Sequence, residues 1–364
     1  MMVVSKQLQV FFDFLRFCIG SAKDIPSSLK EADWEELYAI AQKQCLVGIL
    51  FDGIKKLPAD HVGMKKELLL QWMAESQMLE KANARLNVAA IQVSEWFRKK
   101  GFRTCILKGQ GNALMYPNPY SRTPGDIDIW VEGGDKRVIS FVRSISPHEK
   151  ACYHHIEFPS YKGVEVEVHY RPSFLLCFWH NRKLQKYYER VKEEQFSHRV
   201  MLGEQGEVAI STVEFNLIFQ LTHIYAHLMN EGIGLRQLLD YYYVLISDDF
   251  SLIRDRVQKE LKELGLWKFA GGIMYIMQVV FGMPASRLIV PPNEKYGKFV
   301  LNEVLEAGNF GKHDARNRFG RSQLGHNLQR VYRDIRLVRY FPAEALCEPL
   351  FRIWHFFWRV KNKK

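Results

Sequence analysis

The feature that most constrains the fold of this chain is a change of hydrophobic period near residue 101. Residues 64–100 carry apolar side chains at helical spacing without proline or glycine, which predicts one long helix. After Gly101 the period shortens, and residues 103–107, 126–131, 155–158 and 164–169 predict short strands separated by turn residues. Short strands mixed with short helices predict a small α/β unit that follows a helical segment.

The length of the chain predicts more than one lobe, since 364 residues exceed the usual size of a single hydrophobic core. We expect an N-terminal helical lobe over residues 1–100, an α/β core over residues 101–172 and a mostly helical lobe over residues 173–364. The fold class is therefore α+β, with a small mixed sheet flanked by helical lobes.

Helical patterns and their capping residues complete the expected secondary structure. Ser27 or Ser28 with Glu31 fits a capping box, as does Ser211 with Glu214, and Asp135 is the expected cap of the helix that it opens. A hairpin is expected around residues 203–206. Helices are expected over residues 7–19, 28–55, 135–144, 215–229, 235–246, 251–264, 267–281, 293–306 and 322–340.

The cysteines and the apolar segments bear on the cellular compartment. The six cysteines are scattered without a Cys-x-x-Cys pair, so neither a zinc ribbon nor a disulfide framework is expected. Lys6, Asp13 and Arg16 interrupt the apolar residues at the N-terminus, which is unlike a signal peptide. No stretch reaches the roughly 18 uninterrupted apolar residues of a membrane-spanning helix. A soluble, cytoplasmic protein is the expectation.

Positive charge is concentrated at the C-terminal end. Of the formal net charge of +11, residues 312–364 contribute +9, from 13 Lys and Arg residues against four acids. A helix that carries Arg330, Arg333, Arg336 and Arg339 would present a basic stripe suited to phosphate backbones or other polyanions. The aromatic run at residues 351–358 fits a helix packed on the body, base stacking or an interfacial membrane helix.

Two aspartates and an upstream basic turn form the main candidate site. In a strand, Asp126 and Asp128 share one face while the isoleucines between them share the other. Two neighbouring carboxylates repel each other unless a cation lies between them, and a divalent cation is the usual solution. The turn at Lys108 and Gly109 can grip phosphate, because glycine lets backbone N–H groups approach it.

The strand over residues 164–169 can supply a third carboxylate. Its alternation places Glu165, Glu167 and His169 on one face, and Glu167 is preferred as the partner of the two aspartates. Three carboxylates can hold two Mg²⁺ ions roughly 3.5–4 Å apart, as in phosphoryl and nucleotidyl transfer. The alternative is a solvated strand face without chemistry.

The order of these motifs resembles the polymerase-beta-like nucleotidyltransferase superfamily. It looks most like the branch of uncharacterised bacterial nucleotidyltransferases, which is related to the abortive-infection and toxin-type enzymes. The resemblance covers about residues 30–245. It is carried by Leu107-Lys108-Gly109, Ala113-Leu114, Tyr116, Arg122, Gly125-Asp126-Ile127-Asp128-Ile129, Asp33-Trp34-Glu35, Ala41, residues 167–171, His223-x-x-x-His227 and residues 235–240.

This resemblance implies Mg²⁺-dependent transfer of a nucleoside monophosphate from a nucleoside triphosphate to a hydroxyl acceptor, with release of pyrophosphate. The acceptor would be an RNA such as tRNA, a small molecule or a protein. By resemblance, the metal ligands and catalytic residues are Asp126, Asp128 and Glu167. The nucleotide-binding residues are Lys108, Gly109, Gln110, Arg122, Arg236 and Asp240.

Several alternatives stay open. Most of the superfamily carries Gly-Ser or Gly-Gly where this chain has Gly109-Gln110, so a module that binds nucleotide or RNA without turnover is the second hypothesis. Arg236 and Asp240 are four residues apart and can pair with each other on a helix instead. His223 and His227 have the same spacing, which fits a metal pair or residues that line the site. His154 and His155 are expected at the beginning of a strand, with no catalytic role.

Overall fold

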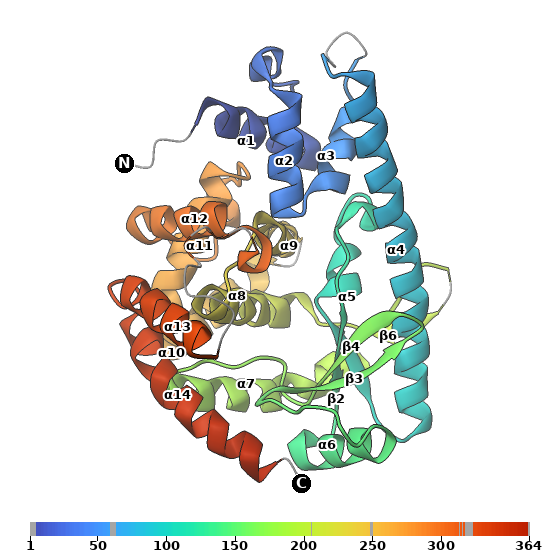
Figure 1. Ribbon diagram of the computed structural model, residues 1–364, viewed down its shortest axis with the longest axis vertical. Coiled ribbons are helices and arrows are strands. Elements are labelled where there is room, and N and C mark those ends of the chain that lie inside the picture. Colours follow the sequence, from blue (N-terminus) through green and yellow to red (C-terminus); the bar gives the residue numbers. More distant parts are fainter. Residues whose placement is uncertain are drawn as a thin grey trace.

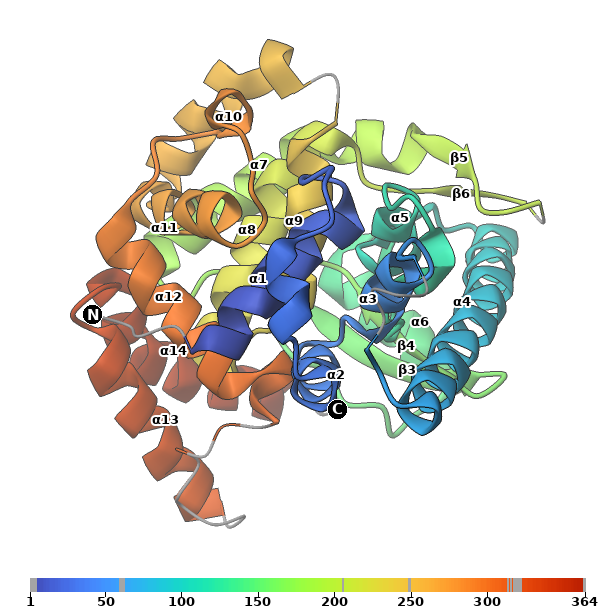
Figure 2. The same cartoon turned by 90° about the horizontal axis from the view of Figure 1, so that it is seen from above.

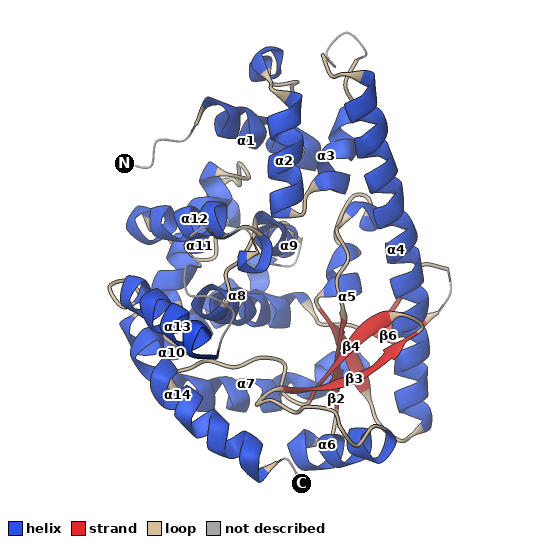
Figure 3. Cartoon of the chain, in the orientation of Figure 1, coloured by secondary structure: helices blue, strands red, loops and turns tan. Residues whose placement is uncertain are grey.

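The computed structural model describes residues 5–58, 63–204, 206–247, 250–312, 314, 316 and 323–362. One long helix, α4 (Lys66–Lys99), runs along one side of the molecule, and a small sheet crosses its lower half (Figure 1). The opposite side consists of helices from the C-terminal half of the chain. Strands are confined to this one region and helices form most of the rest (Figure 3), which confirms the α+β class.

The N-terminal helices pack above the sheet region. They are α1 (Lys6–Ile19), α2 (Trp34–Gln44) and α3 (Val47–Ile54), with a short 3₁₀ helix, η1 (Ser27–Glu31), between the first two. The single helix expected over residues 28–55 is therefore wrong. Asp33 caps α2 by accepting hydrogen bonds from the backbone of Glu35 and Glu36, and Cys45 ends it in the left-handed conformation at φ +56°.

The proposed capping boxes are also corrected by the structure. Ser27 and Ser28 lie within η1, where the Ser28 hydroxyl donates to Asp13 instead of capping a helix. Helix α8 (Val213–Asn230) is capped one residue later than expected, by Thr212 and not Ser211, with Thr212 accepting from the backbone N–H of Phe215. Helix α6 (Gly134–Ile145) begins after Gly133, so Asp135 lies in its first turn and is not its cap. Sequence spacing alone therefore did not identify which of the neighbouring residues is the N-cap of each helix.

The sheet has four strands in the order β1-β2-β4-β3. Strands β1 (Thr104–Leu107) and β2 (Ile127–Val131) are antiparallel, β2 and β4 (Val164–His169) are parallel, and β4 and β3 (His155–Tyr161) are antiparallel. The short helix α5 (Gly109–Ala113) and the 3₁₀ turn η3 (Pro119–Ser121) connect β1 to β2. This is the mixed sheet that the sequence predicts.

Alternation along the strands gives the sheet two different faces. The apolar face, which includes Ile127, Ile129 and Val168, is buried against α4 and α6 in one hydrophobic cluster. The other face carries Asp128 and Trp130, and Trp130 packs in the larger cluster with the C-terminal helices. Because the second face is covered only in part, its polar end opens into a cleft.

The C-terminal half supplies the other wall of that cleft. A two-stranded hairpin is present as expected, although its residue Gln205 lies outside the described residues. The basic helix was expected over residues 322–340, and residue 322 is likewise outside the described residues. The elements are α7 (Phe178–Ser197), β5 (Arg199–Met201), β6 (Glu207–Ala209), α8, α9 (Leu235–Leu245), α10 (Phe250–Glu263), α11 (Trp267–Val279), η4 (Ala285–Arg287), α12 (Glu294–Ala307), η5 (Asn309–Gly311), α13 (Gln323–Leu337) and α14 (Pro342–Lys361).

Seen from above, the C-terminal helices stand opposite α4, with α8 and α9 between them (Figure 2). Two of the four arginines expected to form a stripe on α13 are engaged within the protein. Arg333 is buried and donates to the carbonyls of Asn230 and Glu231, while Arg336 pairs with Glu303. Arg330 and Arg339 are exposed. No helix among the described residues is long and apolar enough to cross a membrane.

Candidate active site

Three carboxylates converge where β2 and β4 run side by side. The parallel register pairs Asp128 with Glu167 directly, and Asp126 precedes the strand on the same side. One oxygen from each of Asp126, Asp128 and Glu167 lies within 4.8 Å of the others. Glu165 is exposed and outside this group. Three carboxylate donors at this spacing are the hard oxygen ligands that Mg²⁺ takes, so the residues present fit the ion that the sequence implies.

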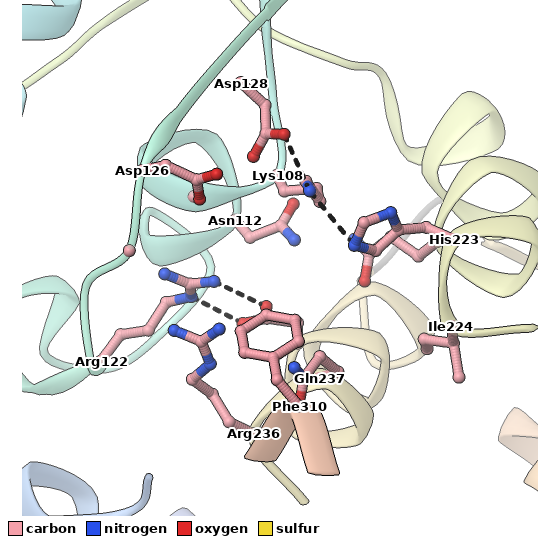
Figure 4. A pocket seen from close by; sticks show the side chains of 14 residues that line it. Lys108, Asn112, Arg122, Asp126, Asp128, His223, Ile224, Arg236, Gln237 and Phe310 are labelled. Carbon is pink, nitrogen blue, oxygen red and sulfur yellow. Dashed lines mark hydrogen bonds and ion pairs between the residues drawn. The ribbon is translucent and has the colours of Figure 1, made fainter. Parts of the chain in front are cut away.

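Two cationic side chains contact the innermost carboxylate. Lys108 Nζ lies 2.9 Å from Asp128 Oδ1 and 3.1 Å from His223 Nε2 (Figure 4). His169 Nε2 lies 3.0 Å from Asp128 Oδ1 and 3.4 Å from Glu167 Oε2. Burial alone would raise the pKa of Asp128, but Lys108 and His169 hold it below its usual range. Burial also opposes the charged form of His169, yet the two carboxylates raise its pKa to about 9.

Asp126 is in a different electrostatic position. The negative charge of Asp128, followed by burial, raises the pKa of Asp126 to about 6, although Lys108 opposes the shift. Repulsion of this kind between neighbouring carboxylates is what a bridging divalent cation relieves. The electrostatics and the donor geometry therefore indicate the same cation position.

The turn that presents Lys108 is strained. Lys108 has φ +48° and ψ −142°, and Gly109 follows at φ +45°. A positive φ is uncommon for a residue with a Cβ and costs about 1–3 kcal/mol. The backbone N–H groups of Gly111 and Asn112 both donate to the Lys108 carbonyl, which holds the turn. The conformation directs the ammonium group toward the carboxylates.

Gln110 is placed away from the pocket. Its side chain is buried and its amide nitrogen donates to Asn87 Oδ1 and to the Asn83 carbonyl of α4. Only the backbone of Gln110 is therefore available for the predicted contact with a triphosphate. The glutamine that departs from the superfamily pattern anchors the turn to the long helix.

A buried ion pair forms the floor of the pocket. Arg122 Nε and Nη2 each lie 2.8 Å from one oxygen of Asp240, and the Tyr116 hydroxyl donates to the same carboxylate at 2.7 Å. The spacing of Arg236 and Asp240 allows them to pair with each other, but the partner of Asp240 is Arg122. Arg236 Nη1 instead donates to the Thr123 carbonyl at 2.9 Å, in the loop before the aspartates. Sequence spacing identified the residues but not their partners.

Arg236 has one buried donor without a partner. The residue is buried and lines the hollow beside Asp126, and its Nε has no acceptor among the described residues. A buried N–H group without a partner is energetically costly.

The carboxylates lie between two adjoining hollows. The first has a volume of about 490 Å³ and the second about 1650 Å³, both including space open to solvent. Lys108, Asp126, Asp128, His223 and Phe310 line both. The first hollow also contains Gly109, Asn112, Arg122, Gln220, Ile224, Gln237 and Asp240, together with Gly125 and Arg236. The second is bounded by α8, β4 and the C-terminal helices, including Arg330, Arg352 and His355.

Several histidines line the second hollow. His223 and His227 both line the cleft, and His223 is hydrogen-bonded to Lys108. They therefore line the site, which is one of the two roles that their spacing suggested. His155 Nδ1 lies 3.4 Å from Glu167 Oε2 and 3.0 Å from His154 Nε2. No catalytic role was expected for His154 and His155. Only the pairing of His155 with His169 across β3 and β4 reveals that they border the site.

Comparison with known proteins gives one family match. A family model described as an uncharacterised nucleotidyltransferase matches residues 30–282, which include the whole sheet and every residue that lines the first hollow except Phe310. No curated protein matches. Among solved structures, the chain is similar to an antigenic nucleotidyltransferase-like protein from Paracoccidioides brasiliensis, at 15% identity and a TM-score of 0.28. That likeness covers 52% of this chain and 91% of the other.

Proposed function

Because the chain belongs to the family of uncharacterised nucleotidyltransferases, we propose that it transfers a nucleoside monophosphate from a nucleoside triphosphate to a hydroxyl acceptor. Pyrophosphate is the second product, and Mg²⁺ is the proposed metal. The observation that carries the proposal is the convergence of Asp126, Asp128 and Glu167 beside Lys108. This group combines metal ligands with a cation for the triphosphate.

The proposed metal ligands are Asp126, Asp128 and Glu167, with Mg²⁺ in two adjacent positions. When bound, divalent ions lower the pKa of an attacking hydroxyl and balance the charge of the leaving pyrophosphate. The protein contributes the fixed positions of its oxygens, because Asp128 and Glu167 are neighbours on paired strands. Preorganised charges of this kind cost no rearrangement during the reaction.

Basic side chains of the first hollow are the proposed triphosphate ligands. Lys108 places its ammonium group at the carboxylates, where it can contact a phosphate oxygen that approaches the metal position. Arg236 lines the same hollow and is the second proposed phosphate ligand. Arg122 and Asp240 then act by holding the floor and the loop in place. The first hollow is thus assigned to the nucleotide.

The second hollow is the proposed acceptor site. It adjoins the first hollow at Asp126 and Asp128, where an acceptor hydroxyl would meet the nucleotide. Lys312 and Arg330 line it as cations, whereas Arg352 is paired with Glu348. The two cations favour an acceptor with phosphate groups, such as an RNA. Binding of an RNA should weaken steeply with salt, whereas binding of an uncharged small molecule should not.

The proposal is tested by incubating the protein with each α-labelled nucleoside triphosphate, Mg²⁺ and total cellular RNA or small-molecule extract. We expect label transfer that falls by about 10²-fold or more in Glu167→Gln, the scale seen when one transition-state contact is removed. Glu165→Gln is the matched control, because Glu165 is on the same strand but outside the cluster. Its activity should stay within about twofold of the wild type, since surface substitutions have small effects.

Two outcomes would count against this function. Equal loss of transfer in Glu165→Gln and Glu167→Gln would contradict the assignment of the site. Tight binding of nucleotide without transfer to any acceptor would favour the non-catalytic module that the Gly109-Gln110 departure suggests.

A further inference from the structure

Two cysteines that are 170 positions apart in the sequence meet where α14 begins to pack on the start of α7. Cys177 is the N-cap of α7, and His180 follows three residues later. Glu344 and Cys347 have the same spacing in the first turns of α14. Residues three apart share a helix face, so each helix offers two potential metal ligands in one direction.

Three of these side chains form a compact group. Ligand atoms of Cys177, His180 and Glu344 lie within 4.8 Å of one another. Cys347 is one helical turn after Glu344 in α14. Burial raises the pKa of the Cys177 thiol, and the Cys347 thiol adds to this shift. Cys177, Glu344 and Cys347 are buried, and the His180 side chain is 20% exposed. The group is separate from the carboxylate site, whose second hollow it does not line.

The distance between His180 and Glu344 distinguishes a metal site from a direct hydrogen bond. His180 Nδ1 lies 3.6 Å from Glu344 Oε1, which is too long for a hydrogen bond. Two ligands of a tetrahedral zinc ion, with bonds of 2.0–2.3 Å, are roughly 3.3–3.8 Å apart. The observed separation therefore fits two ligands that share a cation better than it fits a direct bond.

The surroundings orient the potential ligands. Glu344 Oε2 accepts from the backbone N–H groups of Leu176 at 2.6 Å and Cys177 at 3.2 Å, which leaves Oε1 for a metal. Such outer hydrogen bonds are typical of metal-binding carboxylates. On the other side, a Cβ at Gly265 would lie 2.4 Å from His180 Cε1, so glycine is what admits the imidazole ring here.

We propose that Cys177, His180 and Glu344 bind one Zn²⁺ ion in a closed structural site, with Cys347, one helical turn after Glu344, as its fourth ligand. Two thiolates, an imidazole and a carboxylate are donors that zinc accepts in tetrahedral geometry. The ion would fasten α14 to α7 and so fix the helix whose residues Phe351 and Arg352 border the second hollow. Because no nucleotide or transfer step is involved, this proposal stands apart from the proposed function.

The test uses Co²⁺ as a spectroscopic substitute for zinc. The full-length protein is stripped of metal, kept reduced with a phosphine and titrated with Co²⁺ alone. We expect one equivalent to bind with thiolate-to-cobalt charge-transfer absorption, and this absorption should be lost in Cys177→Ser and in Cys347→Ser. Cys105→Ser and Cys152→Ser are the matched controls and should retain it. Cys105 is buried in β1, and Cys152 lies beside the histidines of the cleft.

His180→Asn provides a milder variant if a serine variant does not fold, and it should weaken Co²⁺ binding at least tenfold while the helical circular dichroism is unchanged. Absence of charge-transfer absorption in the wild type would overturn the proposal. So would absorption that survives in Cys347→Ser. A disulfide between Cys177 and Cys347 in the protein purified without reductant, detected by peptide mass spectrometry, would assign the pair to redox chemistry instead.

Discussion

Substitution of Asp240 by Asn tests whether the buried ion pair on the pocket floor supports the fold or binds nucleotide. Both oxygens of Asp240 accept from Arg122 at 2.8 Å, and both side chains are less than a tenth exposed. Asparagine keeps the shape of aspartate but removes its charge and one acceptor. The guanidinium of Arg122 would then remain buried without a counter-charge.

The expected cost follows from that burial. Breaking a buried ion pair from one side costs about 3–5 kcal/mol, because the remaining charge is uncompensated. Tyr116→Phe removes only the hydroxyl that donates to Asp240 at 2.7 Å, so it should cost about 1 kcal/mol. Glu95→Gln is the matched exposed case, since Glu95 pairs with Arg98 at the surface. An exposed pair contributes about 0–1 kcal/mol.

The free energy of unfolding is measured by urea denaturation, followed by circular dichroism, without nucleotide. The order of destabilisation should be Asp240→Asn, then Tyr116→Phe, then Glu95→Gln. Nucleotide affinity is measured in parallel by calorimetry. A loss of less than about 1 kcal/mol in Asp240→Asn, together with a tenfold loss of nucleotide affinity, would refute the structural role and make Asp240 a ligand of the nucleotide.

Two further substitutions test packing and linkage away from the site. Gly297→Ala should lower the free energy of unfolding by about 1–3 kcal/mol, because its Cβ would lie 2.3 Å from Tyr275 Cδ1 where α11 and α12 meet. Thermal unfolding measures this, and unchanged stability would show that Tyr275 can move aside. Burial, followed by the charge of Glu348, raises the pKa of Asp334 to about 7, so folding favours the protonated carboxyl. Its stabilising contribution is complete below the ordinary pKa of Asp and is lost as pH rises toward and through 7. Asp334→Asn should therefore be more stable than the wild type at pH 8 by about 1.4 kcal/mol or more, the value of one pKa unit, and the gain should vanish near pH 4. A gain that is the same at both pH values would contradict this origin.

The α/β core was readable from local pattern. Strand alternation places Asp126 and Asp128 on one side and isoleucines on the other, whatever the rest of the chain does, because successive side chains in a strand point to opposite faces. The long helix before the core was equally clear, since α4 has no residue that breaks a helix. The mixed sheet and the α+β class follow from these local signals.

Helix ends were read less well. Thr212 caps α8 in place of Ser211, and Gly133 precedes α6 in place of Asp135. Neighbouring polar residues have similar capping propensities, so the choice between them depends on how the adjoining segment is held. Two of the four arginines of α13, Arg333 and Arg336, were expected at the surface but contact other parts of the protein. A helical spacing identifies which residues share a face, but it does not say whether solvent or protein covers that face.

The sequence by itself determined the chemical inventory of this protein: a carboxylate pair, a basic turn and a third carboxylate on a later strand. Tertiary structure decided the partners. The parallel pairing of β2 with β4 sets Glu167 beside Asp128, Arg122 reaches Asp240 across 118 positions, and Cys177 meets Cys347 across 170. Local pattern depends on the geometry of a few adjacent residues, whereas these contacts depend on register and on the packing of distant elements. That packing, which no short window of sequence contains, makes the pocket.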